Sequence, residues 1–261
     1  MKTFVYTDLH GNYNLFKQIQ NYLGDDDRAI CLGDNCDRGP DGIKIIQETL
    51  KDNRFIYLLG NHEAMLVDAV RKSQHNGNIS FRMFDDADME ILKHNGTIHT
   101  LQTLQLLPQE ERDSLINKLD KLPICVFAKG KDDCTMFLSH AGCNPQTLYE
   151  MDKPETNFKL IWDRKHIAKT KFIYEGNENL YIIHGHTPVQ TLRFYTKELK
   201  EYDKAEIVYY CEGHKIDLDI CTPETNKVAL FDLSTFEVIY FVDDTKLNYL
   251  IIIKKSYIIF I

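Results

Sequence analysis

Residues 28–40 read RAICLGDNCDRGP, and they contain the pattern from which the fold class can be inferred. A short apolar run leads into a Gly-Asp turn, which predicts a buried strand that ends in a polar loop. Pro40 stands where a helix accepts its first proline, and apolar residues then recur at helical spacing from Ile43 to Leu50. The stretch therefore predicts one strand–loop–helix unit with its charged residues in the loop.

The same pattern occurs once before and once after this stretch. Residues 3–8, TFVYTD, form an apolar run that ends at Asp8, and residues 54–62, RFIYLLGNH, form another that ends at Asn61 and His62. The three loop positions Asp8, Asp34 and Asn61 are 26 and 27 residues apart, which is the length of a βαβ crossover. We therefore expect three parallel strands whose polar loops open on one edge of one sheet, where such sheets bind ligands.

Beyond residue 71 the pattern changes twice. Helical spacing over 86–94, 97–107 and 109–121 predicts a helical insertion at about 72–122, and β-like runs return from Ile124. The predicted fold class is α/β, a β-sandwich flanked by helices with this insertion, in a single domain over 1–240. Residues 241–261 form an apolar tail of open role. Its end, 249–261, is shorter than the roughly 20 residues that a membrane span needs, so no transmembrane segment is expected.

Composition narrows the class of protein. The chain has 261 residues with 31 Lys and Arg against 39 Asp and Glu, a net charge of −8, so no nucleic-acid partner is expected. Seven cysteines without a CxxC pair indicate free thiols in a reducing compartment. Polar residues as early as Asp8 leave no room for a signal peptide. We expect a cytoplasmic protein, and its oligomeric state stays open.

Five short stretches hold the side chains of a metal site. They lie at residues 8–11, 33–39, 60–63, 140–142 and 184–187, at or beside the ends of apolar runs. Their donors are oxygen and nitrogen with no thiolate, which suits Mn, Fe, Zn or Mg. An aspartate with two oxygens can bridge a pair of such ions.

These stretches resemble the GDxHG, GDxxDRG, GNHE, HAG and GH motifs of the metallophosphoesterases. More narrowly, the chain from residue 3 to about 235 is similar to the PPP-type serine/threonine protein phosphatases of bacteria and phages. The resemblance implies a calcineurin-like metallophosphoesterase fold that binds two divalent ions, with Mn²⁺ as the first choice and Fe or Zn as alternatives.

The resemblance also implies a role for each site residue. Asp8 and His10 would bind the first ion, Asp34 would bridge both, and the second ion would be completed by Asn61, His140 and His186. His62 would be the general acid, with Asp37 orienting its ring. Arg38 and Arg164 would bind the phosphoryl oxygens. The implied reaction is direct attack of a metal-bridging hydroxide, without a covalent phosphoenzyme.

Some residues have a plainer interpretation or depart from the family pattern. His184 is predicted to point to the other face of its strand, His166 to be a surface or packing histidine, and Glu63 to support the site without binding metal. Thr7 stands where many members have glycine, and Asn35 and Cys36 replace an aromatic and an apolar residue. The thiol of Cys36 is predicted to be buried and inert.

The predicted function is a phosphomonoesterase that hydrolyses phosphoserine or phosphothreonine in proteins and peptides. One alternative is a symmetrical dinucleoside tetraphosphatase of the same superfamily. A minor alternative is a non-catalytic binding module that keeps the fold. The basic residues within 153–171 would steer an anionic substrate toward Arg164, or would simply form a solvated helix face.

Overall fold

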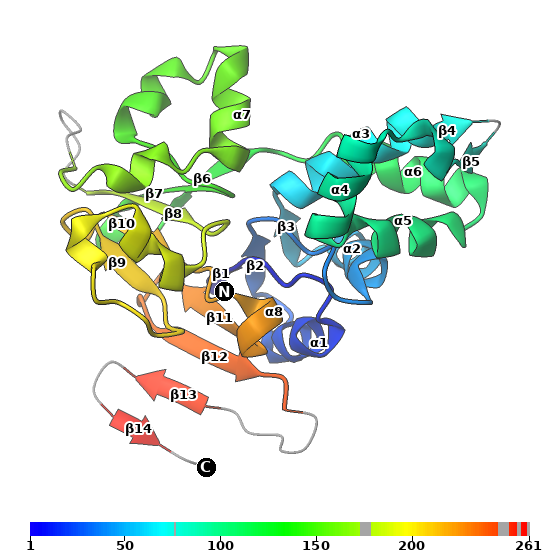
Figure 1. Cartoon of the computed structure of the whole chain (residues 1–261). Helices are drawn as coiled ribbons and strands as arrows, with labels where there is room; N and C mark the ends of the chain where they lie inside the picture. The colour runs from blue at the N-terminus through cyan, green and yellow to red at the C-terminus, as the bar shows by residue number, and fades with distance from the viewer. Residues whose placement is uncertain (76, 173–178, 245–250, 255–256, 260–261) are drawn as a thin grey trace.

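The computed structural model describes residues 1–75, 77–172, 179–244, 251–254 and 257–259. Two β-sheets pack face to face, and helices lie around them (Figure 1). In the described residues the first sheet has the order β14-β13-β12-β11-β1-β2-β3, and the second has the order β6-β7-β8-β10-β9. The predicted α/β fold with a sandwich core is confirmed.

The first sheet is built from strands at both ends of the chain: β1 Thr3–Tyr6, β2 Arg28–Cys31, β3 Phe55–Tyr57, β11 Lys227–Asp232, β12 Val238–Val242, β13 Ile251–Lys254 and β14 Tyr257–Ile259. The second sheet comes from the later half: β6 Cys125–Lys129, β7 Thr135–Ser139, β8 Leu180–His184, β9 Val208–Tyr210 and β10 Lys215–Asp217. A two-stranded hairpin joins β4 Gln74–His75 to β5 Asn78–Ile79. The α-helices are α1 Tyr13–Tyr22, α2 Gly42–Lys51, α3 Asn61–Ser73, α4 Asp86–Asn95, α5 Thr97–Gln105, α6 Gln109–Leu119, α7 Pro154–Trp162 and α8 Thr222–Thr225.

The strands β1, β2 and β3 are parallel, as their spacing predicts. Side chains alternate across this sheet because successive residues of a strand point to opposite faces. Val5 and Ile30 face the second sheet, where they pack with Leu138 and Ile183. Tyr6 faces the opposite side. One face of the sheet therefore forms the sandwich core, and the other is free for helices.

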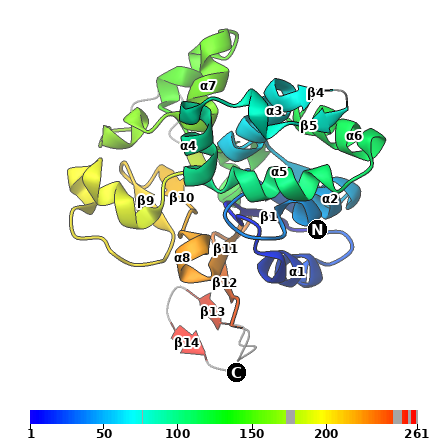
Figure 2. The same cartoon turned by 45° about the vertical axis from the view of Figure 1, so that its right-hand side comes forward.

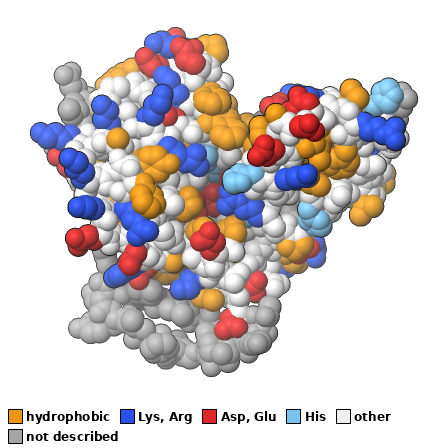
Figure 3. All heavy atoms as spheres, viewed as in Figure 1, with side chains coloured by type: hydrophobic (Ala, Val, Ile, Leu, Met, Phe, Trp, Pro, Cys, Tyr) orange, Lys and Arg blue, Asp and Glu red, His pale blue; other side chains and the backbone are white. Residues whose placement is uncertain are grey.

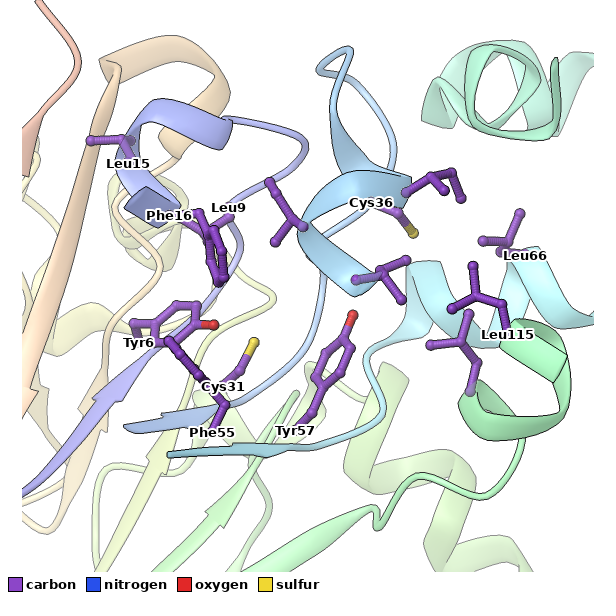
Figure 4. Packing of buried hydrophobic residues seen from close by; sticks show 14 of the residues in the cluster. Tyr6, Leu9, Leu15, Phe16, Cys31, Cys36, Phe55, Tyr57, Leu66 and Leu115 are labelled. Carbon is purple, nitrogen blue, oxygen red and sulfur yellow. The ribbon is translucent and has the colours of Figure 1, made fainter. Parts of the chain in front are cut away.

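Helices α1, α2 and α3 cover that other face, on the same side of the sheet (Figure 2). Phe16 of α1 packs on Phe55 of β3, whose ring also meets Tyr6 edge-on (Figure 4). Each helix follows its strand, so each strand's carboxyl end opens into a loop at the same edge of the sheet. The sequence pattern thus sets where the three polar loops lie.

Between α3 and β6 the chain forms the β4–β5 hairpin and helices α4, α5 and α6; α5 and α6 pack against α3, and α4 packs against α5. The helical ranges agree with the predicted ones to within two residues. Helix α4 and helix α7 stand on opposite sides of the polar loops (Figure 1). The insertion therefore forms a side wall of the crevice.

The last strands extend the first sheet past β12. Strand β12 runs through the boundary that we place at residue 240, and β13 and β14 continue antiparallel to it. Part of the apolar tail, including Tyr249, lies outside the described residues. Within the described part of the chain, no helix is both long and apolar enough to cross a bilayer.

Candidate dinuclear metal centre

The predicted metal donors converge from both sheets. Asp8 and Asp34 follow β1 and β2, and Asn61 opens α3 just after β3. His140 and His186 follow β7 and β8 of the second sheet. All of these side chains are buried, although the chain segments that carry them are up to 178 residues apart.

The carboxylate of Asp34 lies at the centre of the cluster. Its Oδ2 is 3.3 Å from His140 Nε2, 3.8 Å from His62 Nε2 and 3.9 Å from His10 Nε2. The distance to His10 exceeds a hydrogen bond, but it suits two donors that share an ion at about 2.1 Å from each. Asp34 thus belongs to both groups of possible metal ligands, one with His10 and the other with His140 and His186.

The second group of donors meets at the amide of Asn61. Asn61 Oδ1 is 2.8 Å from His140 Nε2 and 2.7 Å from His186 Nδ1. Among the described residues, His186 Nε2 and His140 Nδ1 are buried without a hydrogen-bond partner. The donor set that fits a divalent ion is made by the opposite ring nitrogens, His140 Nε2 and His186 Nδ1, together with the Asn61 and Asp34 oxygens.

The backbone at the centre is unusual. Six of the predicted site residues have positive φ although none is glycine, a conformation that costs free energy and concentrates at functional sites. They are Asp8, His10, Asp34, Asp37, Arg38 and His186, with φ between 45° and 69°. The surrounding contacts therefore determine the loop conformations more than local preference does.

Glu63 fixes the loop that carries Asp34 through hydrogen bonds to backbone amides. Its Oε2 accepts the amide hydrogens of Asp34 (2.8 Å) and Gly60 (3.1 Å), and its Oε1 accepts that of Asn35 (2.9 Å). Tyr57 also donates its hydroxyl to Oε1 at 2.8 Å. Each oxygen is thus committed to the protein, which agrees with a supporting role for Glu63.

The departures from the family pattern have local explanations. The hydroxyl of Thr7 donates to Asp8 Oδ2 at 2.5 Å, a contact that glycine cannot make. Cys36 is fully buried, and burial raises the pKa of its thiol well above the usual value. Cys36 is therefore a protonated, inaccessible thiol, as predicted.

His62 is held by a carboxylate on the side away from Asp34. Its Nδ1 is 2.7 Å from Asp37 Oδ2, the arrangement predicted for these two residues. Burial disfavours the charged imidazole, but Asp34 and Asp37 outweigh burial and raise the pKa of His62. By contrast, burial and the neighbouring His62 hold the pKa of His10 well below its ordinary value.

Two threonines complete the support of Asp37. Thr97 Oγ1 donates to its Oδ2 at 2.7 Å, and Thr100 Oγ1 donates to its Oδ1 at 2.6 Å. Both stand on α5 of the insertion, one turn apart. We did not predict that these two threonines belong to the site. The sequence does contain a signal for them: two hydroxyl residues stand three positions apart on one helix face, just after Asn95-Gly96.

The two arginines line the cavity over the donors, which has a volume of about 250 Å³. Arg38 is exposed, and Arg164 Nη2 donates to the His186 carbonyl at 3.3 Å. Trp162 of α7 and His94 of α4 form part of the rim. Figure 3 shows the hollow between the two sides of the molecule, with charged and histidine side chains gathered in it.

Sequence reasoning also missed Asp219. It lines the same cavity as Asp8 and is almost fully buried, with Oδ1 accepting the Cys221 amide at 2.8 Å. Its signal is its place just after β10, at the same edge as the ligand loops. Asp219 adds a third carboxylate beside the first predicted ion site.

Behind the second group of donors lies a buried polar network. Lys215 Nζ is 3.2 Å from His166 Nδ1 and 2.9 Å from the His166 carbonyl, and His166 Nε2 is 2.6 Å from the Ala141 carbonyl. His184 points away from the donors, with Nε2 2.8 Å from the Tyr210 hydroxyl. His166 and His184 are therefore packing residues, as predicted, and they support the loops that carry His140 and His186.

Comparisons with known proteins agree with this geometry. The family model of the calcineurin-like phosphoesterases matches residues 1–218. Serine/threonine-protein phosphatase 2 of Escherichia coli K12 is 24% identical over 201 residues, covering 75% of this chain and 84% of that protein. An asymmetrical bis(5'-nucleosyl)-tetraphosphatase, PrpE, of Oceanobacillus iheyensis is 27% identical over 219 residues, covering 72% and 78%.

A solved structure shares the fold. The cold-active protein-tyrosine phosphatase of a psychrophilic Shewanella superposes with a TM-score of 0.54 at 15% identity, covering 92% of this chain and 77% of that one. The match of the family model over most of the chain, with the two-sheet fold and the clustered His and Asp donors, identifies the family. The chain belongs to the calcineurin-like phosphoesterases, a family of dinuclear, metal-dependent hydrolases.

Proposed function

We propose that this protein is a phosphoprotein phosphatase that hydrolyses phosphoserine and phosphothreonine esters. The observation that carries the proposal is one cavity lined by two arginines, by His62 with its partner Asp37 behind it, and by five of the six buried donors. The sixth donor, His140, is buried against Asn61. Two divalent ions, Mn²⁺ by preference, would be held by Asp8, His10, Asp34, Asn61, His140 and His186. When bound, they would activate water and neutralise charge on the phosphoryl group.

The protein's own groups have distinct parts in the reaction. Arg38 and Arg164 approach the cavity from different loops, so together they hold and orient a phosphoryl group by its oxygens. His62 donates the proton that the leaving alkoxide needs, because Asp37 keeps its ring oriented and raises its affinity for that proton. Thr97 and Thr100 fix Asp37 in turn.

The size of the cavity favours a phosphoester at the surface of a protein or peptide. About 250 Å³ accommodates a phosphoryl group with the first atoms of its leaving group, while the remainder of a protein substrate stays in the open hollow. Steering by the basic run has little support, because Lys153 and Lys159 both form ion pairs with Glu150.

A dinucleoside tetraphosphatase is the second candidate. Phe158 and Trp162 of α7 stack with ring centroids 6.1 Å apart; Trp162 lines the cavity, and Phe158 is 63% exposed. Such a pair can stack with a base. The tetraphosphatases named PrpE among the relatives are asymmetrical enzymes. The alternative function that we considered from the sequence was a symmetrical dinucleoside tetraphosphatase.

One side-by-side assay distinguishes the candidates. The Mn²⁺-loaded protein is given phosphoserine and phosphothreonine peptides, diadenosine tetraphosphate and a cyclic-nucleotide diester, and kcat/KM is measured for each. We expect the best phosphopeptide to exceed the others, and Phe158→Ala to leave that order unchanged. If diadenosine tetraphosphate exceeds the best phosphopeptide by about a hundredfold, the phosphoprotein proposal is wrong.

A further inference from the structure

A second cavity adjoins the metal centre. Its volume is about 330 Å³, and it shares His10 and Arg38 with the catalytic cavity as a common wall. The far walls come from the loop before α1, from Asp41 at the start of α2, and from Asp243 after β12. A substrate held at the metal centre can therefore extend past Arg38 into this space.

Two carboxylates in the second cavity have no cationic partner in the part of the chain that the structure describes. Among the described residues, neither Asp41 nor Asp243 forms an ion pair with a lysine, arginine or histidine. Asp41 stands at the N-cap position of α2, yet its side chain makes no capping hydrogen bond. Asp243 Oδ1 accepts a hydrogen bond from Asn14 Nδ2 at 3.1 Å. The cavity thus offers negative charge and amide oxygens to whatever enters it.

Tyr13 is the aromatic residue that lines the second cavity, and its ring already contacts other side chains. The ammonium of Lys44 lies 3.5 Å from the ring centroid of Tyr13, and the ring of Phe16 packs 6.1 Å away. The Tyr13 hydroxyl donates to Glu48 at 2.5 Å. A nucleobase needs an accessible ring face for stacking, so this wall favours a charged or hydrogen-bonding group over a base.

We propose that the second cavity binds a lysine or arginine side chain next to the phosphorylated residue of the substrate. Its ammonium or guanidinium group would lie between Asp41 and Asp243, while Arg38 faces the phosphoryl group, whose charge offsets that of Arg38. The net charge of −8 suits a basic substrate segment. This inference rests on the proposed phosphoprotein phosphatase function and specifies which phosphoproteins that function selects.

The test uses peptides with a non-hydrolysable phosphonate in place of phosphoserine. One arginine is moved from three residues before the phosphonate to three after it in a neutral background, and each peptide inhibits hydrolysis of p-nitrophenyl phosphate by the Mn²⁺-loaded protein. We expect Ki to fall about tenfold at one or two arginine positions. Asp41→Asn and Asp243→Asn should each abolish that preference and leave kcat and KM for p-nitrophenyl phosphate unchanged.

Both variants keep the shape of the side chain, and asparagine is as good an N-cap as aspartate. Asp26→Asn, at an exposed position on the loop before β2, is the matched control and should keep the preference. Equal Ki at every arginine position, or a preference that survives both variants, overturns the inference. A failure to hydrolyse the parent phosphopeptides, with arginine-dependent inhibition intact, would instead overturn the proposed function and leave the cavity assignment standing.

Discussion

His62 contacts a different aspartate through each of its ring nitrogens. Its Nδ1 contacts Asp37, which is not a proposed metal ligand, and its Nε2 lies 3.8 Å from Asp34, which is one. That arrangement suits a proton donor, although its position also places it among the candidate donors around Asp34. A proton donor and a metal ligand would respond differently to the substitution His62→Asn.

His62→Asn should leave metal content unchanged and lower kcat for a phosphoserine peptide by about 10²–10⁴-fold, the usual effect of losing a general acid. The loss should be smaller for p-nitrophenyl phosphate, because p-nitrophenolate leaves without being protonated. Steady-state kinetics with both substrates measure this, and His94→Asn at the exposed rim is the control. Equal losses for both substrates, or loss of an ion, would mean that His62 binds metal or is structural.

Lys215 is fully buried, and burial lowers its pKa to about 8. An unfolded lysine keeps its proton up to about pH 10.4, so between about pH 8 and pH 10 the unfolded chain binds more protons than the native one at this residue. Stability contributed by this group is therefore reduced below pH 8 and rises as the pH increases through that window.

Lys215→Met removes this dependence. The free energy of unfolding of the wild type, minus that of the variant, should rise by about 2–3 kcal/mol between pH 7 and pH 10. Urea unfolding under reducing conditions at several pH values measures it. A difference that does not change with pH would show that Lys215 titrates normally in the folded protein.

At the scale of elements, the insertion meets the catalytic loop at one backbone position. Gly96 joins α4 to α5 with φ +80°. A Cβ atom at this position would lie 2.6 Å from the backbone nitrogen of Arg38 and 2.9 Å from the Cα of Arg38. Gly213, with φ +85°, has nothing within 4 Å of the same position. The two glycines therefore share a backbone conformation and differ in what surrounds them.

Gly213→Ala should cost about 1–2 kcal/mol of stability, because it places alanine in the left-handed region. Gly96→Ala should cost more, because its methyl group also meets the backbone of Arg38. Only Gly96→Ala should also lower kcat/KM, since the added methyl group displaces Arg38. Urea unfolding and phosphopeptide kinetics on the two variants separate the effects. Similar activity in both would show that the junction does not position Arg38.

At the scale of the whole molecule, the proposed ions would join the two sheets, because Asp8, Asp34 and Asn61 come from one and His140 and His186 from the other. Chelation should abolish activity and lower Tm, and Mn²⁺ should restore both. An ion that binds only the native state adds about 2.7 kcal/mol when its concentration is 100 times its Kd. Full activity after exhaustive chelation would contradict the metal-dependent mechanism.

Two aspartates distinguish bridging from single-site binding. Asp34→Asn should weaken the binding of both ions, whereas Asp8→Asn should chiefly weaken one. Metal content after dialysis and the gain in Tm on adding Mn²⁺ measure this for each variant. Loss of a single ion from Asp34→Asn would show that Asp34 does not bridge.

The local pattern of the sequence was enough to predict the elements and most of the donors. Apolar period, turn residues and the even spacing of Asp8, Asp34 and Asn61 are properties of short segments, and parallel strands bring their carboxyl ends to one edge whatever surrounds them. The residues that we propose to bind metal stand in those loops. Their places along the chain therefore followed from the sequence.

The distant groups that support and extend the site became apparent only from the packing of the folded chain. Thr97 and Thr100 lie 60 and 63 residues from Asp37, and Asp243 closes a cavity whose other carboxylate is Asp41. No local pattern relates such pairs, because their contact depends on how the insertion packs on α3 and where β12 ends against α1. The sequence by itself determined the chemistry at the strand ends; the packing of separate elements determined how that chemistry is held and what can lie beside it.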